Sequence, residues 1–200
     1  IYENIQLSNI PLSLKSLAIT SAIAGEGRST FILGLALSVA RHRQRVLVID
    51  ADLRCPSLHK PFNLTNQSGL ADCLSGEIEH PTIEQVSFLG ETINLISSGS
   101  KPQDPVKLLS SSKFQNLIDQ YKQNYDLILV DTPPAIGMVD AIRVASICDS
   151  TVLMMRLDKV KASELIEAEA LLSKLNVLGI VANDSKQYET QSPFLLPQPA

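Results

Sequence analysis

Unbroken runs of aliphatic residues constrain the fold of this chain more than any other feature of its sequence. None of the runs alternates apolar with polar residues, so each strand that they form is expected to be covered on both faces. Parallel sheets with helices on both sides bury their strands in this way. Five runs occur, at residues 17–21, 46–50, 127–131, 151–155 and 177–182, and a shorter strand is expected at residues 93–96.

Segments with helical spacing separate these runs. Residues 161–175 place Ala168 and Leu172 on one side and charged residues on the other, as an amphipathic helix does. Residues 29–43 and 112–122 also fit helices, and the first of these is apolar enough in its middle to lie buried on the sheet. Strands that alternate with helices predict a doubly wound α/β fold, in which helices cover both faces of a mainly parallel sheet.

The chain is expected to form one main domain over residues 15–184, which suits its length of 200 residues. Residues 51–105, richer in Pro, Ser, Asn and Gly, are expected to form loops and short elements. Residues 1–14 are interpreted as a lead-in, and residues 185–200 as a flexible tail. The first residue, Ile1, indicates a fragment or a processed form, and no apolar run approaches the ~20 residues that span a membrane.

Charge and cysteine content bear on the partners of the chain. Its 17 basic and 21 acidic residues give a net charge of −4, which argues against a nucleic-acid partner but allows a local basic pocket. Cys55, Cys73 and Cys148 lie far apart and form no C-x-x-C pair, so free thiols in a reducing compartment are expected. No histidine has zinc-ligand spacing to them.

A glycine-rich segment follows the first run and opens the first predicted helix. Glycines there let backbone N–H groups approach phosphate oxygens at the positive end of a helix. The segment approaches the P-loop signature G-x-x-x-x-G-K-[ST], but Ala22 replaces the first Gly and Arg28 replaces the Lys. An ordinary glycine turn before a helix is the alternative. The candidate nucleotide-binding residues are Ala24, Gly25, Glu26, Gly27, Arg28, Ser29 and Thr30.

Carboxylates end two of the runs. Asp50 ends the second run, Asp52 lies two residues further on, and Asp131 ends the run at residues 127–131. Ligands of open α/β sheets bind beyond the carboxyl ends of the strands, where such acids hold Mg²⁺ or accept a proton from a hydroxyl. Solvated acids at a strand end are the alternative for either motif alone. Together behind a glycine loop, the three motifs predict a site for ATP or ADP with Mg²⁺.

These motifs resemble the Walker A, A′ and B set of the bacterial tyrosine kinases, or BY-kinases. The resemblance is carried by residues 25–30, by IDADLRCP at 49–56 and by DTPP at 131–134, and it extends in the family's order over most of residues 15–183. It implies a domain that phosphorylates protein tyrosines with Mg-ATP and regulates the chain length and export of exopolysaccharide or capsule. It also implies a place at the cytoplasmic face of the bacterial inner membrane.

The resemblance assigns a role to each matched position at the strand ends. Arg28 stands where the family has its phosphate-contacting Lys. Asp50 and Asp52 match the A′ acids, one of which is implied as the base toward tyrosine, and Asp50 is favoured. Ser29 and Asp131 match the Mg²⁺ positions, to which Asp50 is added as a third candidate ligand.

The resemblance also implies features of adenine recognition, of the C-terminal tail and of the assembly. Asn183 looks like the residue that reads adenine, although capping a helix or turn is also a frequent role of Asn. Tyr188 is the candidate phosphoacceptor, since it is the only Tyr after the last predicted strand, where the family has a cluster. The implied partners are a membrane-anchored activator module on the same or another chain, protein tyrosines as substrates, and further copies in a ring. The ring helix of the family carries E-x-x-R-x-x-R, whereas residues 1–4 contain no Arg and are at most a remnant of it.

Two other functions stay open. The planar guanidinium of Arg28 is larger than an ammonium and differently placed, so the chain could be a catalytically impaired regulatory module that still binds nucleotide. A partitioning or division-site ATPase of the same P-loop branch is the second alternative. Against it, Ile23 occupies the position of the extra Lys that those proteins carry. A dehydrogenase is disfavoured, because the glycines do not follow G-x-G-x-x-G.

Overall fold

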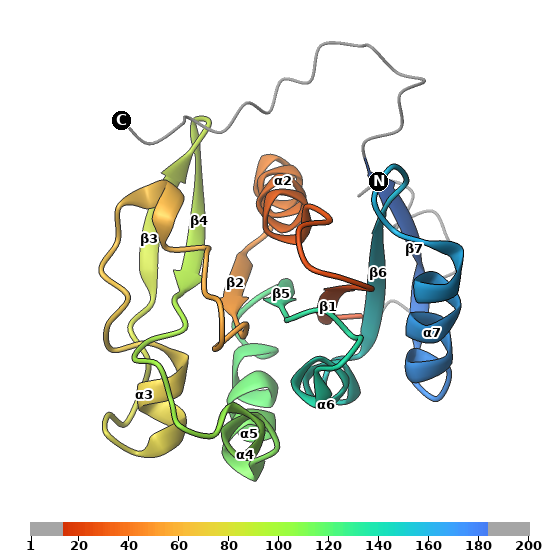
Figure 1. Ribbon diagram of the computed structural model, residues 1–200. Coiled ribbons are helices and arrows are strands. Elements are labelled where there is room, and N and C mark those ends of the chain that lie inside the picture. Colours follow the sequence, from red (N-terminus) through yellow and green to blue (C-terminus); the bar gives the residue numbers. More distant parts are fainter. Residues whose placement is uncertain (1–13, 184–200) are drawn as a thin grey trace.

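In the computed structural model of this protein, residues 14–183 are described, and they form a seven-stranded sheet. The strand order is β3-β4-β2-β5-β1-β6-β7, and every neighbouring pair is parallel except β3 with β4. All six strands expected from the sequence are present, which confirms the doubly wound α/β fold (Figure 1). The strands are β1 (Ser16–Ser21), β2 (Val46–Asp50), β3 (Glu84–Phe88), β4 (Glu91–Ile96), β5 (Leu127–Asp131), β6 (Ser150–Arg156) and β7 (Val177–Asn183).

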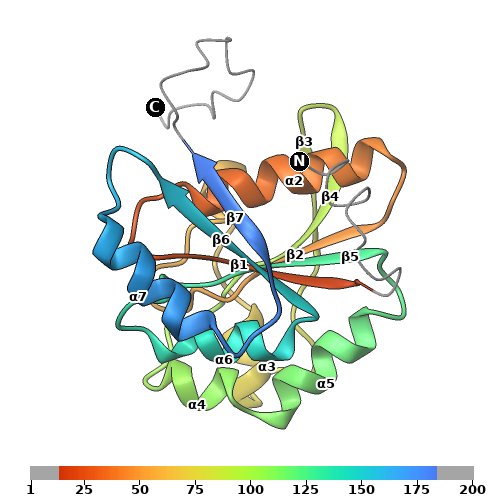
Figure 2. The same cartoon turned by 90° about the vertical axis from the view of Figure 1, so that its right-hand side faces the viewer.

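Helices cover both faces of the sheet, as predicted. Helix α2 (Arg28–Arg41) crosses one face, and the helices α3 to α7 lie on the opposite side (Figure 2). Helix α2 ends two residues earlier than expected, because the chain turns into a left-handed conformation at Arg43, whose φ is 58°. The remaining helices are α3 (Leu70–Ser75), α4 (Pro105–Leu109), α5 (Ser112–Tyr121), α6 (Val139–Ile147) and α7 (Ala162–Leu172), with a single 3-10 turn, η1 (Lys60–Phe62).

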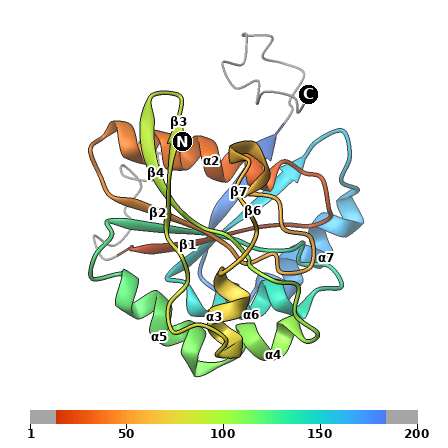
Figure 3. The same cartoon turned by 90° about the vertical axis from the view of Figure 1, so that its left-hand side faces the viewer.

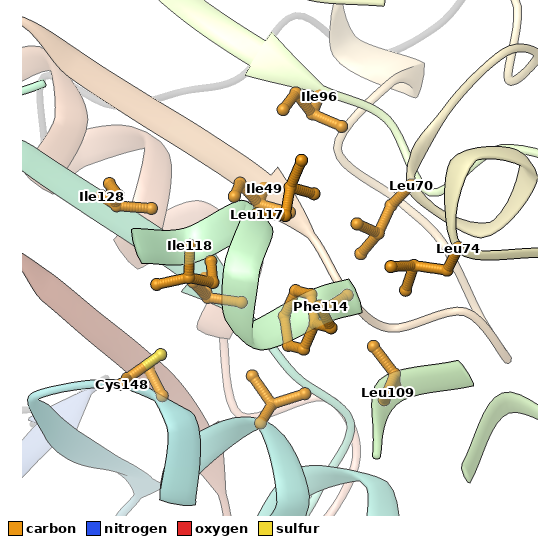
Figure 4. Packing of buried hydrophobic residues seen from close by; sticks show 14 of the residues in the cluster. Ile49, Leu70, Leu74, Ile96, Leu109, Phe114, Leu117, Ile118, Ile128 and Cys148 are labelled. Carbon is orange, nitrogen blue, oxygen red and sulfur yellow. The ribbon is translucent and has the colours of Figure 1, made fainter. Parts of the chain in front are cut away.

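Successive residues of the central strands point to opposite faces of the sheet and pack into two separate hydrophobic cores. Val46 and Val48 of β2 pack under α2, while Leu47 and Ile49 point to the other side. There Phe114 of α5 is fully buried in an aliphatic cluster (Figure 4). Burial of a side chain of this size stabilises the fold by roughly 2–3 kcal/mol.

Several short elements were not individually expected from the sequence, among them β3 and α6. Strand β3 lies at the sheet edge and buries only Val86, so no unbroken aliphatic run marks it (Figure 3). Helix α6 begins at the exposed Val139 and buries Asp140 in its first turn. A buried carboxylate within such a short helix obscures its apolar periodicity.

Other expectations concern the chain as a whole. Cys55, Cys73 and Cys148 form no disulfide, as predicted. Among residues 14–183, no helix combines the length and the apolar character needed to cross a bilayer. Most of the predicted lead-in, the predicted tail and the candidate phosphoacceptor Tyr188 lie outside the described residues.

Candidate functional site

The loop between β1 and α2 has the backbone conformation of a phosphate-binding turn. Gly25 and Gly27 have φ angles of 77° and 91°, in the left-handed region that glycine enters without strain. The carbonyl of Gly27 accepts the N–H of Phe31 at 2.9 Å, so the loop turns directly into α2. The free N–H groups and the dipole at that helix terminus favour an anion. Ala24 and Thr30 are exposed at the same loop.

Two of the predicted metal ligands are in contact at the start of α2. The hydroxyl of Ser29 donates to Oδ2 of Asp131 at 3.0 Å and lies 2.8 Å from Oγ of Ser57. The other carboxylate oxygen of Asp131, Oδ1, is buried and has no hydrogen-bond partner among the described residues. A hydroxyl beside a carboxylate oxygen that accepts no hydrogen bond is the donor set that a P-loop offers to Mg²⁺.

The third predicted ligand, Asp50, is occupied by the loop that follows β2. Asp50 and Asp131 stand opposite each other in neighbouring strands. Oδ2 of Asp50 accepts the N–H groups of Ser57 and Leu58, both at 3.0 Å, and Oδ1 accepts the N–H of Asp52 at 3.3 Å. The fully buried Asp50 carboxylate therefore folds residues 51–58, the A′ loop, back over the strand end. Its assignments as metal ligand and as base stay predictions.

Burial raises the pKa of both strand-end carboxyl groups. Removal from water raises the pKa of Asp131 to about 7, with help from the charge of Asp50 and against the charge of Arg28. Desolvation likewise raises the pKa of Asp50 to about 6, against the backbone N–H groups of Leu58 and Ser57. In the absence of a divalent cation these neighbouring carboxyl groups retain protons at a higher pH than ordinary Asp side chains.

The side chain of Arg28 turns toward these carboxylates. Its Nη1 donates to Oγ of Ser21 at 2.5 Å, and its Nη2 lies 3.3 Å from Oδ2 of Asp52. Its Nε lies 3.6 Å from Oδ1 of Asp131 and makes no hydrogen bond. Arg28 and both carboxylates are almost completely buried. The cation at position 28 is thus shared among two acids and a hydroxyl at the base of the site.

Glu26 and Asn183 tie the glycine loop to the last two strands. Glu26 is fully buried, and its carboxylate accepts the N–H of Ile23 at 2.8 Å and the N–H of Arg156 at 2.9 Å. Nδ2 of Asn183 donates to the carbonyl of Glu26 at 3.0 Å. The Glu26 side chain is therefore an internal brace, while Asn183 lies beside the loop, as its predicted role requires. Contact of either residue with nucleotide stays a prediction.

The site has the donors for Mg²⁺ only if the nucleotide contributes too. Within residues 14–183, no group of three His, Cys, Asp or Glu side chains could hold a metal ion by itself. Mg²⁺ at nucleotide sites takes one or two protein oxygens and completes its octahedron with waters and phosphates. The Ser29 hydroxyl and Oδ1 of Asp131, which accepts no hydrogen bond, fit that requirement.

Two features of the site could not be assigned from the sequence. Arg54, in the A′ loop, forms a two-point ion pair with Asp140 of α6, with distances of 2.5 Å and 3.2 Å. Both residues belong to segments that carry the family resemblance, but one sequence does not reveal a pair separated by 86 positions. The second is Lys159, whose ammonium lies against Gly25 so closely that a Cβ there would overlap it.

Known proteins match the chain over nearly its whole length. A family model described as an AAA domain matches residues 14–177. Over 190 residues the chain is 34% identical to the tyrosine-protein kinase YwqD of Bacillus subtilis, covering 93% of this chain and 79% of that protein. It is 35% identical over 188 residues to the tyrosine-protein kinase CpsD of Streptococcus agalactiae, covering 91% of this chain and 82% of that one. The chain belongs to the bacterial tyrosine-kinase family. The resemblance carried by its three motifs is thereby confirmed.

Solved structures agree with this membership. The kinase domain of the Escherichia coli tyrosine kinase ETK superposes with a TM-score of 0.87 at 28% identity, over 96% of this chain and 76% of that one. The cell-division ATPase MinD of Pyrococcus furiosus gives a TM-score of 0.72 at 22% identity, over 88% of this chain and 74% of that one. The second likeness shows a common fold alone, so the comparisons favour the tyrosine kinases over the division-site ATPases.

Proposed function

We propose that this chain is the ATP-dependent kinase domain of a protein-tyrosine kinase that regulates the chain length and export of exopolysaccharide or capsule. One observation carries the proposal. At the N-terminus of α2, the Ser29 hydroxyl contacts Asp131, whose second oxygen accepts no hydrogen bond and lies 3.6 Å from Nε of Arg28, beside a glycine loop with two left-handed residues. That arrangement supports binding of Mg-ATP, and the family of the chain supports tyrosine as the acceptor.

In this proposal, different residues bind the phosphates, hold Mg²⁺ and accept the tyrosine proton during phosphoryl transfer. The N–H groups of the glycine loop and the N-terminus of α2 would hold the phosphates. Mg²⁺ beside Ser29 and Asp131 would neutralise negative charge on the transferred phosphoryl group. Asp50 and Asp52 are the proposed acceptors of the tyrosine proton. The pKa of Asp50, raised to about 6, suits a base that works near neutral pH.

The partners in this proposal follow from family membership. A membrane-anchored activator module, on the same chain or on a partner chain, would bring the kinase domain to the cytoplasmic face of the inner membrane. Neighbouring copies would then present tyrosines, with Tyr188 as the candidate acceptor of this chain. Arg28 in place of Lys makes the efficiency of transfer the property that most needs measurement.

The test is incorporation of phosphate into tyrosine. The purified chain is incubated with Mg-ATP and a Glu–Tyr copolymer, and phosphotyrosine on the copolymer and on the chain is quantified by mass spectrometry. We expect Mg²⁺-dependent phosphotyrosine that Asp131→Ala abolishes. The variants Asp50→Asn and Asp52→Asn test the two candidate proton acceptors, because the variant that lacks the acceptor should lower the rate of transfer by more than it lowers Mg-ADP affinity. Mg-ATP binding without any phosphotyrosine would contradict the kinase and indicate a regulatory module.

A further inference from the structure

The turn that follows β6 is fastened to the glycine loop. The carboxylate of Glu26 accepts the N–H of Arg156, and the carbonyl of Arg156 accepts the N–H groups of Lys159 and Val160, both at 3.0 Å. The Arg156 guanidinium lies 2.9 Å from the carboxylate of Asp158. Because the acceptor at the base of this turn is a fully buried side chain of the loop, the turn has a fixed place over the loop.

This turn places Lys159 at the mouth of the glycine loop. The Lys159 ammonium occupies the space next to Gly25, where a Cβ would overlap it. The side chain is exposed, and it makes no ion pair with any carboxylate of residues 14–183. Its sequence neighbour Asp158 pairs with Arg156 instead. An exposed lysine usually extends into water, so close contact with the loop is the informative feature here.

The cation inside the site has different contacts. Arg28 is shared among Ser21, Asp52 and Asp131, which leaves much of its charge neutralised before any ligand arrives. Phosphates at the loop carry several negative charges, and an ammonium, which has three N–H donors, contacts such oxygens well. The ammonium that P-loops usually carry at position 28 is therefore available from a second place in this chain.

We propose that Lys159 is a phosphate-contacting residue of the nucleotide site, which closes on the polyphosphate of a bound nucleoside di- or triphosphate from the β6 turn. This inference rests on the proposed nucleotide site and adds a binding residue to it. Gly25 is part of the recognition, because only a residue without a side chain leaves room for the ammonium.

The test compares Lys159→Ala with Lys161→Ala, which removes the side chain of another exposed lysine two positions further on. Mg-ADP affinity is measured by calorimetry at two salt concentrations, together with the melting temperature of each ligand-free variant. We expect Lys159→Ala to weaken Mg-ADP about tenfold, the effect of one charge-assisted hydrogen bond. Its affinity should also depend less on salt, and its melting temperature should stay unchanged. Lys161→Ala should stay within about twofold of the natural chain.

The outcomes separate this inference from the proposal beneath it. If the natural chain does not bind Mg-ADP, the nucleotide site itself is wrong. If the natural chain binds and Lys159→Ala matches Lys161→Ala in affinity and in salt dependence, the role of Lys159 alone is wrong.

Discussion

The base and the rim of the nucleotide site differ in how their charges are balanced. At the base, Arg28 is buried and already faces Asp52 and Asp131. At the rim, Lys159 is exposed and lies against Gly25 with no ion pair to the described acids. The charges of Arg28, Asp52 and Asp131 thus balance one another at the base of the site, where a proton or a cation can be exchanged. The charge of Lys159 at the rim is available to an incoming anionic ligand.

This difference predicts how each region responds to mutation and to salt. Charges in a buried site interact in a low dielectric and are weakly screened, whereas exposed charges are screened over about 10 Å at 0.1 M salt. Changes at the base should therefore have large effects that salt hardly alters. Changes at the rim should be smaller and should shrink as salt is added.

The largest effect is expected from loss of the carboxylate at the base. Asp131→Ala removes the buried oxygen that fits Mg²⁺ and the acceptor of the Ser29 hydroxyl. We expect Mg-ADP affinity to fall roughly 100-fold, the upper end of the effect of groups that support a metal site. Calorimetry checks this, with the exposed Asp119→Ala as the matched control. Equal affinities of the two variants would remove Asp131 from the site.

The connection between base and rim is the next target. Glu26→Ala leaves the N–H groups of Ile23 and Arg156 without their acceptor, and an unsatisfied buried donor costs about 1–3 kcal/mol. We expect unfolding free energy in urea to fall by about 2–4 kcal/mol. Glu26→Gln, which keeps one acceptor oxygen, should lose roughly half as much. A Glu26→Ala chain as stable as the natural one would mean that the brace contributes nothing.

The free energy of unfolding of the ligand-free chain should depend on pH because of the two buried carboxyl groups at the base of the nucleotide site. Asp131 and Asp50, with pKa values raised to about 7 and about 6, bind protons more tightly in the folded than in the unfolded chain, where Asp titrates near about 3.9. Stability should therefore fall as pH rises from about 4 through about 7 and then level off, with a slope of at most about 1.4 kcal/mol per pH unit for each proton.

Melting curves with chelator at pH 5.5 and pH 8.0 measure this effect. Asp131→Asn removes one of the two titrating groups, so its difference between the two pH values should be smaller than that of the natural chain. An unchanged difference would show that Asp131 does not titrate in this range.

The smallest effect is expected at the exposed pair of the rim. Asp158→Asn breaks the contact with Arg156, in which the two side chains are 43% and 38% exposed. Exposed pairs contribute about 0–1 kcal/mol, so unfolding free energy should change by less than about 0.5 kcal/mol. Mg-ADP affinity should stay within about twofold. A tenfold loss would show that this pair, rather than the Glu26 brace, holds the turn over the loop.

Sequence patterns predicted the parts of this molecule that repeat along the chain. The strand ends at Asp50 and Asp131 and the turn at Gly25 follow from aliphatic runs and glycine spacing. They lie together at the carboxyl ends of the central strands, as expected. Contacts between segments that lie far apart in the sequence could not be predicted. The side chain of Glu26 points into the protein because Arg156 lies behind it, and Lys159 reaches the loop because β6 is the neighbour of β1. Such partners are fixed by packing, which one sequence does not display.

The most direct test of the central claim is a calorimetric titration of the natural chain and of Arg28→Lys with Mg-ADP. The account predicts one binding site per chain in both proteins, since the glycine loop, Ser29 and Asp131 are in place whichever cation stands at position 28. Binding of Mg-ADP by the Arg28→Lys variant but not by the natural chain would contradict the account. Arg28 would then prevent the nucleotide from binding at the glycine loop.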